Sequence, residues 1–188
     1  MFVFSTEQFR TLLDHQSSFS SLLDIGAGDG SVTKRMSSLF EEIYVTELSK
    51  TMQWRLARSG YTVLDPDDWG DRKFDVITCL NVLDRCEKPI SLLKQIASHL
   101  KAQTGRLIVS LVLPFKPYFE YNEHHLPQEY LSVQGCTPEE QINRLIKNLF
   151  EPLGFHVTKF SRLPYISEGD IERSYYFLFT YIFVLEMP

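Results

Sequence analysis

The chain has 188 residues, 44% hydrophobic and 23% charged, which is ordinary for a globular protein and enough to bury one full core. We therefore expect a single domain over residues 1–188. Its net charge of −5 disfavours a nucleic acid as partner, because phosphate binding needs concentrated Lys and Arg. No apolar run reaches transmembrane length, so we predict no membrane segment and a cytoplasmic location.

The three cysteines form no C-x-x-C pair and leave an odd count (Cys79, Cys86 and Cys136). This usage fits a reducing compartment and predicts no metal site. His124 and His125 are adjacent, and neighbouring loop residues rarely bind one metal together. We interpret both as solvated loop residues.

The first half of the chain alternates predicted helices and strands. Apolar residues at helical spacing predict three helices: 6–15, 31–40 and 49–59. Short apolar runs between them predict four strands: 21–25, 43–48, 61–64 and 74–80. The last run is almost continuously apolar, as expected for a strand that is covered on both faces.

The second half adds a helix over 89–100 and a strand over 106–113. Residues 114–135 show no clear period and are unusually long for a connection, which indicates a substrate-loop insertion. A capped helix is predicted over 137–153. Closing strands are predicted over 155–160 and 175–185, with a loop over 161–174 between them.

Alternating strands and helices indicate an α/β fold with a mostly parallel sheet covered on both faces. The final strand follows a loop rather than a helix, which suits an antiparallel last strand. We therefore predict the seven-stranded, Rossmann-like class I fold of methyltransferases that depend on S-adenosylmethionine (SAM).

Residues 22–30, LLDIGAGDG, place an acid in a strand end before a glycine-rich turn. Asp24 with Gly26, Gly28 and Gly30 resembles the first motif of SAM-dependent methyltransferases, whereas dinucleotide-binding turns have G-x-G-x-x-G. We expect the turn to lie beneath the methionine part of SAM, with helix-start amides facing its carboxylate. The Asp24 carboxylate would favour the cationic sulfonium.

Ligands of an open α/β sheet bind at the carboxyl ends of its strands. Glu47 ends the second predicted strand and is expected to accept hydrogen bonds from both ribose hydroxyls. Three residues after the third strand are expected near the adenine ring: Asp67, Asp68 and Trp69. Asn81 follows the fourth strand and is expected near the transferred methyl group.

Five strings of the sequence resemble the DREV family, also called methyltransferase-like protein nine: 22–30, 41–49, 81–86, 113–118 and 162–170. The resemblance covers nearly all of the chain. It implies methylation of protein histidine at the ring nitrogen nearest the backbone, the pros nitrogen, in His-x-His motifs. The cofactor would be SAM, the partners would be proteins or peptides with such motifs, and we expect a monomer. Family members carry a longer N-terminal region, so a location in the endoplasmic reticulum or mitochondrion is expected if one precedes this chain.

With this chemistry, the candidate catalytic residues are Asp84 and Asn81, which is expected near the transferred methyl group. A neutral imidazole attacks with one nitrogen and carries a proton on the other, so a carboxylate that accepts this N–H selects the reactive tautomer. Asp84 is our candidate for that acceptor, and it would also stabilise the imidazolium product as a triad Asp does. The alternative for Asp84 and Arg85 is a surface ion pair.

The other strings supply candidates for substrate binding. Tyr118 and Tyr165 would stack on imidazole or hydrogen-bond the peptide, although core packing is the alternative for both. Arg162 is a further candidate, and Glu168 and Asp170 would hold the second histidine of the motif.

Two other functions remain open from the sequence. A methyltransferase for small molecules would keep the cofactor site and close residues 114–135 over a sealed pocket. A non-catalytic SAM-binding adaptor would tolerate the loss of Asn81 and Asp84.

Overall fold

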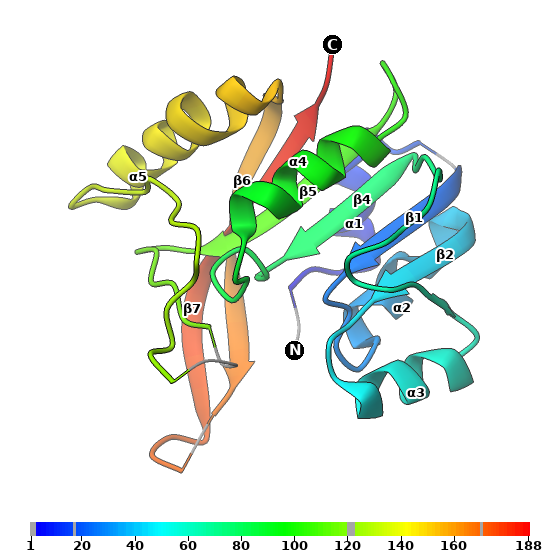
Figure 1. Ribbon diagram of the computed structural model, residues 1–188, viewed down its shortest axis with the longest axis horizontal. Coiled ribbons are helices and arrows are strands. Elements are labelled where there is room, and N and C mark those ends of the chain that lie inside the picture. Colours follow the sequence, from blue (N-terminus) through cyan, green and yellow to red (C-terminus); the bar gives the residue numbers. More distant parts are fainter. Residues whose placement is uncertain (1–2, 17, 120–122, 170) are drawn as a thin grey trace.

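The computed structural model describes residues 3–16, 18–119, 123–169 and 171–188. In these residues seven strands form one sheet with the order β3-β2-β1-β4-β5-β7-β6 (Figure 1). The strands are β1 (Phe19–Ile25), β2 (Phe40–Thr46), β3 (Thr62–Val63), β4 (Val76–Leu80), β5 (Arg106–Val112), β6 (His156–Glu168) and β7 (Tyr175–Glu186).

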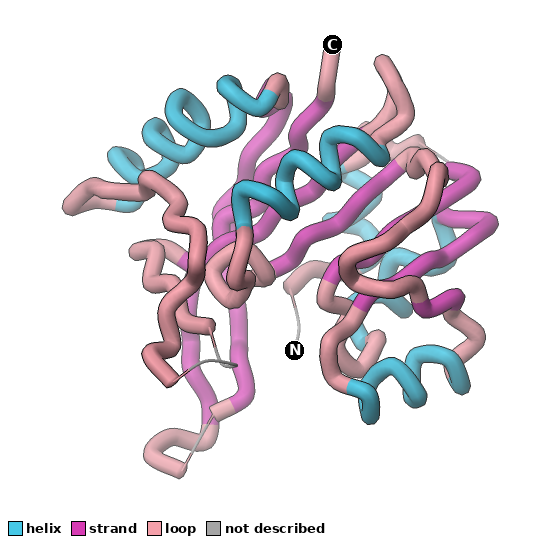
Figure 2. Tube along the Cα trace, viewed as in Figure 1, coloured by secondary structure: helices cyan, strands magenta, loops and turns pink. Residues whose placement is uncertain are grey.

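Helices cover both faces of the sheet, as the tube view shows (Figure 2). They are α1 (Thr6–Leu12), α2 (Ser31–Met36), α3 (Lys50–Arg58), α4 (Pro89–His99) and α5 (Pro138–Leu145). Side chains of α4 and α5 belong to one hydrophobic cluster, and side chains of α1 and α2 belong to another. The sheet therefore separates two cores.

Local sequence explains where several helices begin. Ser5 and Gln8 form a reciprocal capping box at the start of α1. The Thr137 hydroxyl accepts the Glu140 N–H, and Pro138 takes the first position of α5, where a missing N–H costs nothing. Beyond α5 the chain continues through a π turn (Ile146–Phe150) and a 3₁₀ turn to Gly154.

The predicted fold class is confirmed. Strands β1 to β5 pair in parallel, and β7 runs antiparallel to both β5 and β6. The described residues of 114–135 form neither helix nor strand.

The predicted loop over 161–174 is wrong. Strand β6 continues to Glu168 and pairs with β7 up to the Glu168–Tyr175 pair. Pro164 suggested a loop, but β6 is the edge strand of the sheet, where a proline is tolerated because its missing N–H is not needed by a neighbour. Strand β5 pairs with β7 only as far as Thr180, so the ends of β6 and β7 extend past β5 as a two-stranded ribbon (Figure 1).

Candidate functional site

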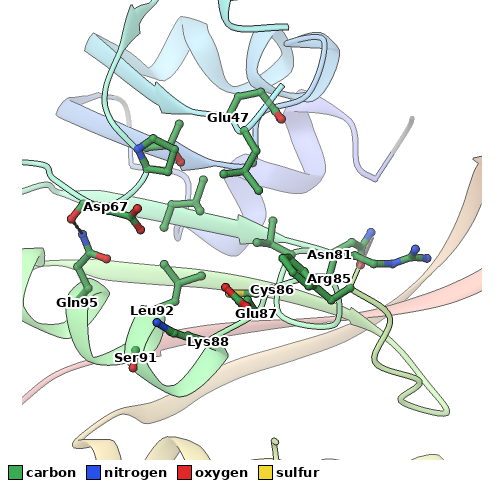
Figure 3. A pocket seen from close by; sticks show the side chains of 17 residues that line it. Glu47, Asp67, Asn81, Arg85, Cys86, Glu87, Lys88, Ser91, Leu92 and Gln95 are labelled. Atoms are coloured by element: carbon green, nitrogen blue, oxygen red, sulfur yellow. Dashed lines mark hydrogen bonds between the residues drawn. The ribbon is translucent and has the colours of Figure 1, made fainter. Parts of the chain in front are cut away.

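A cavity of about 540 Å³ opens at the carboxyl ends of β1, β2 and β4. This volume falls within the roughly 300–1,000 Å³ that is usual for small-molecule sites. Figure 3 shows its wall, which combines these strand ends with the first turns of α4. The lining includes Gly26, Glu47, Asp67, Asn81 and Arg85.

The glycine turn shapes one side of the cavity. Gly26, Gly28 and Gly30 have φ of +67°, +58° and +79°, which residues with a Cβ rarely adopt. A Cβ on Gly26 would lie 2.7 Å from the Val82 Cγ2 atom, so the turn packs directly on the segment after β4. Of the three glycines, Gly26 lines the cavity, whereas Gly30 begins α2.

Glu47 follows β2 and is fixed by two backbone hydrogen bonds. Its Oε2 atom accepts the Gly28 N–H at 2.9 Å, and its Oε1 atom accepts the Ser49 N–H at 2.9 Å. The carboxylate thus ties the glycine turn to the start of α3 while it lines the cavity. Each carboxylate oxygen has further lone-pair capacity, so this arrangement can still accept hydroxyl donors from a ligand.

Asp24 does not line the cavity, contrary to the expected role beside a sulfonium. Its two carboxyl oxygens accept the Thr33 hydroxyl at 2.6 Å and the Thr78 hydroxyl at 2.7 Å. Burial raises its pKa to about 6, although these hydrogen bonds act in the opposite direction. Asp24 therefore links α2 to β4 through two buried hydrogen bonds, close to the glycine turn.

Of the three candidates in the loop after β3, only Asp67 is among the residues that line the cavity. Its backbone carbonyl accepts the Gln95 side chain at 3.2 Å (Figure 3). Asp68 is exposed outside the lining and accepts the Gly70 N–H. Trp69 is only 1% exposed, packs edge-on against His99 and is not among the lining residues.

Asn81 lines the cavity directly after β4 in a left-handed conformation, with φ of +56°. Asn tolerates this region better than most residues with a side chain. Its Oδ1 atom accepts the Ser110 hydroxyl of β5 at 3.2 Å and the Thr180 hydroxyl of β7 at 3.3 Å. Three strands therefore orient this amide.

Asp84 lies between two lining residues in sequence, Asn81 and Arg85, but is not itself among the residues that line the cavity. Its side chain is 12% exposed, and its Oδ2 atom lies 3.5 Å from the Arg85 Nε atom. Its Oδ1 atom is buried and has no hydrogen-bond partner within the described part of the chain. Burial raises the pKa of Asp84, and the Arg85 charge lowers it in part. The pair exists, but burial of the acid distinguishes it from a surface ion pair.

Both candidate tyrosines interact with this acid, Tyr118 through its backbone and Tyr165 through electrostatics. Tyr165 belongs to β6 and is 6% exposed; burial raises its pKa, while hydrogen bonds with Ser167 and Asn81 act in the opposite direction. Tyr118 is 41% exposed, and its backbone N–H donates to the Asp84 carbonyl at 2.7 Å. The structure therefore brings both tyrosines to the Asp84 neighbourhood.

Arg162 is not brought there. It stacks on Phe179 with its guanidinium carbon 3.7 Å from the ring centroid and pairs in register with Tyr181. Side chains alternate between the faces of a strand, so Arg162 lies on the face opposite to Tyr165. Glu168 ends β6, and Asp170 lies outside the described residues.

The sequence analysis missed the buried hydroxyls that organise the site. Ser110 and Thr180 hold Asn81, and Thr33 and Thr78 hold Asp24. A signal did exist, since Ser110 and Thr180 each interrupt a strongly apolar strand. A hydroxyl in such a place usually has a buried partner.

The described residues contain no group of three or more His, Cys, Asp or Glu side chains arranged to hold a metal ion. None of their helices has the length and hydropathy of a membrane span.

Comparisons with solved structures show the same fold at low sequence identity. A putative methyltransferase from Bacillus halodurans has a TM-score of 0.59 at 13% identity, covering 95% of this chain and 97% of its own. A SAM-dependent methyltransferase from Clostridium acetobutylicum has a TM-score of 0.61 at 16% identity, covering 97% and 90%. Magnesium protoporphyrin IX methyltransferase from Synechocystis, solved with bound S-adenosylhomocysteine (SAH), has a TM-score of 0.60 at 15% identity, covering 97% and 81%.

The family comparison covers almost the whole chain. A family model for DREV methyltransferases matches residues 1–187. The five strings that resemble this family include the glycine turn, Glu47, Asn81 and Asp84. All of them follow the carboxyl ends of neighbouring parallel strands. The chain belongs to the DREV methyltransferase family and is a methyltransferase that depends on SAM.

Proposed function

We propose that this protein transfers the methyl group of SAM to the pros nitrogen of histidine in His-x-His motifs of proteins. The observation that carries the proposal is the Asp84 carboxyl, which keeps one buried oxygen without a partner in the described residues next to a cofactor-sized cavity. The sequence resemblance to a family that methylates protein histidine supports it.

The cavity fits SAM by its own features. Gly26 lines the cavity with backbone alone, and Glu47 presents a fixed carboxylate to it. Asp67 and the apolar side chains of Leu48 and Leu92 line the same cavity, which suits a purine ring with an amino group. When bound, SAM supplies a methyl group on a sulfonium sulfur.

The residues beside Asn81 suit an imidazole as the acceptor. A buried polar atom without a partner carries a free-energy cost, and a ligand that hydrogen-bonds to it removes that cost. In our proposal the Asp84 Oδ1 atom accepts the N–H of the far ring nitrogen, which leaves the lone pair on the pros nitrogen. The same carboxylate stabilises the imidazolium that forms and accepts its proton.

In our proposal Asn81 and Tyr165 orient the imidazole that accepts the methyl group. The Asn81 Oδ1 atom is occupied by two hydroxyls, so the amide cannot rotate without breaking both hydrogen bonds. Fixed orientation of the nucleophile supplies much of the rate in such transfers. No strong base is needed, because free histidine is mostly neutral at pH 7.

The test is methyl transfer from labelled SAM to a peptide with an Ala-His-Ala-His sequence, with each histidine replaced by Ala in turn. Mass spectrometry and NMR of the product identify the modified ring nitrogen. Transfer to the pros nitrogen that weakens, with a raised KM, when the neighbouring histidine is replaced supports the proposal. Binding of SAH without any peptide methylation contradicts it and favours a small-molecule acceptor or a binding role.

A further inference from the structure

An imidazole of the chain itself, that of His125, packs beside the segment that brings Phe119 to the cavity. The ring of His125 stacks on the ring of Tyr118, with centroids 4.7 Å apart and planes 12° from parallel. Its Nδ1 atom lies 3.2 Å from the Phe119 carbonyl oxygen. The Phe119 N–H in turn donates to the His125 carbonyl at 3.0 Å.

This stack is connected to Asp84 through the backbone and through Arg85, whose side chain pairs with the Asp84 carboxylate. Tyr118 is bonded through its N–H to the Asp84 carbonyl, and the Arg85 guanidinium lies 5.5 Å from the centroid of the same tyrosine ring. Phe119 lines the cavity. The ring of His125 is therefore held beside Phe119, which lines the cavity, and on Tyr118, which contacts Asp84 and Arg85.

The surroundings of His125 are specific to an imidazole. An aromatic face and a carbonyl oxygen satisfy both the ring surface and one ring nitrogen. His124, its neighbour, is exposed and has no hydrogen bond or ring contact with any described residue. His125 also has φ of +53°, which is uncommon for a residue with a side chain.

We propose that the Tyr118 face and the Phe119 carbonyl form a second imidazole subsite, which binds the unmethylated histidine of a His-x-His substrate and which His125 fills in the free protein. The inference rests on the proposed function. In an extended peptide the side chains of residues i and i+2 point to the same side, so two histidines can reach Asp84 and Tyr118 together. The buried carboxyl suits the reacting ring, and the exposed stack suits the second ring.

Competition follows from this arrangement. The substrate must displace His125, so its apparent affinity is reduced by the fraction of protein in which the subsite is occupied. A peptide with one histidine does not use the subsite and pays no such penalty. His125 then lowers the affinity only for the motif with two histidines.

The first experiment compares KM for two peptides, one with the intact motif and one with Ala in place of the histidine that is not methylated. We expect His125→Ala to lower KM for the two-histidine peptide about three- to tenfold, with kcat unchanged. KM for the one-histidine peptide should not change. His124→Ala is the matched control, being the same substitution one residue away, and should leave both peptides unchanged.

Tyr118→Leu tests the other side of the stack. Loss of the Tyr118 ring should remove the preference for two histidines, so that the two-histidine and one-histidine peptides have equal KM values. If His125→Ala changes KM for both peptides alike, His125 has only a structural role in the loop and the subsite proposal is overturned.

A second experiment measures occupancy directly by NMR of protein with isotope-labelled histidine, in the presence of SAH. The chain has 5 histidines, and the spectrum of His125→Ala identifies the His125 signals. We expect the two-histidine peptide to move these signals toward the positions of a solvated ring, and the one-histidine peptide to leave them. Unmoved signals at saturating two-histidine peptide overturn the subsite.

The two proposals fail in different ways. If neither peptide is methylated, the histidine methyltransferase proposal is wrong and the subsite falls with it. If both peptides are methylated and His125→Ala has no effect on either KM, the enzymatic proposal stands and the subsite alone is wrong.

Discussion

The cofactor side and the substrate side of the site are built in different ways. Gly26, Glu47 and Asp67 follow three strands of the first half of the chain, β1, β2 and β3, and each is placed by the end of its own strand. Asp84 follows β4, Tyr118 lies in the long loop and Tyr165 lies on β6, so the three meet only through the pairing of β5, β7 and β6. The cofactor side is therefore local in sequence, and the substrate side depends on the completed sheet.

The two sides also differ in how their carboxylates are satisfied. Both oxygens of Glu47 and both oxygens of Asp24 accept hydrogen bonds within the protein. Asp84 has one buried oxygen with no partner in the described residues. The carboxylates of the cofactor side are thus held in place by the protein, whereas the substrate side has a buried carboxyl oxygen that can accept a hydrogen bond from a ligand.

The strongest test of this difference is Asp84→Asn, which should remove catalysis and leave the cofactor side intact. Loss of the acceptor for the imidazole N–H should lower kcat by about 10²–10⁴-fold. Affinity for SAH, measured by calorimetry, should stay within a few-fold. Asp71→Asn, the same change at an exposed position, should alter neither quantity. A collapse of SAH affinity would assign Asp84 to the cofactor side.

Gly26→Ala should break the cofactor side instead. The new Cβ would lie 2.7 Å from Val82, in a backbone conformation with φ of +67°. Overpacking and left-handed strain together should lower the free energy of unfolding by about 2–5 kcal/mol. Denaturant unfolding measures this loss, and calorimetry should show weakened SAH binding.

Gly60→Ala is the matched control for that variant. Its φ is +88°, but a Cβ there would meet nothing within 4 Å. The strain alone should cost about 1–2 kcal/mol, with SAH affinity retained. Equal losses in the two variants would mean that the contact with Val82 is not important.

The same division explains what the sequence could predict. The glycine turn, Glu47 and Asn81 follow strands that are strongly patterned, so their places at one sheet edge could be inferred from periodicity alone. Trp69 could not, because nothing in the local sequence distinguishes an indole that turns into the core from one that faces a ligand. Strand β6 was cut short in the prediction because Pro164 has no local signal of edge position, which is a property of the whole sheet.

Asp24 offers a test by pH. Its folded pKa of about 6 lies above the ordinary value of 3.8, so between these values the folded state binds more protons than the unfolded state. Stability therefore falls as the pH rises through this window. One pKa unit corresponds to about 1.36 kcal/mol, so the loss contributed by Asp24 should be about 3 kcal/mol.

Asp24→Asn keeps the shape of the side chain and removes this titration. Urea unfolding at pH 4, 5, 6 and 7 should show wild-type stability falling relative to the variant by about 2.4 kcal/mol across the series, because part of the window lies below pH 4. Parallel curves would show that Asp24 does not titrate in this window. The result tests whether the buried Asp24 carboxyl, which accepts the Thr33 and Thr78 hydroxyls, contributes to the stability of the cofactor side.

Glu47→Gln is the most subtle test of the cofactor side. The neutral amide keeps one acceptor oxygen for the N–H groups of Gly28 and Ser49 and turns an NH₂ group toward the other. Hydrogen bonds to a charged group are worth about 1.5–3 kcal/mol against about 1 kcal/mol for neutral ones, so SAH affinity should fall roughly tenfold. Methyl transfer at saturating SAM should remain, since Glu47 follows β2 whereas Asp84 follows β4. Glu41→Gln, an exposed position on β2 itself, is the control that should change nothing. An unchanged affinity in Glu47→Gln would remove Glu47 from the cofactor site, and a fall in kcat at saturating SAM would show that the two sides are not independent.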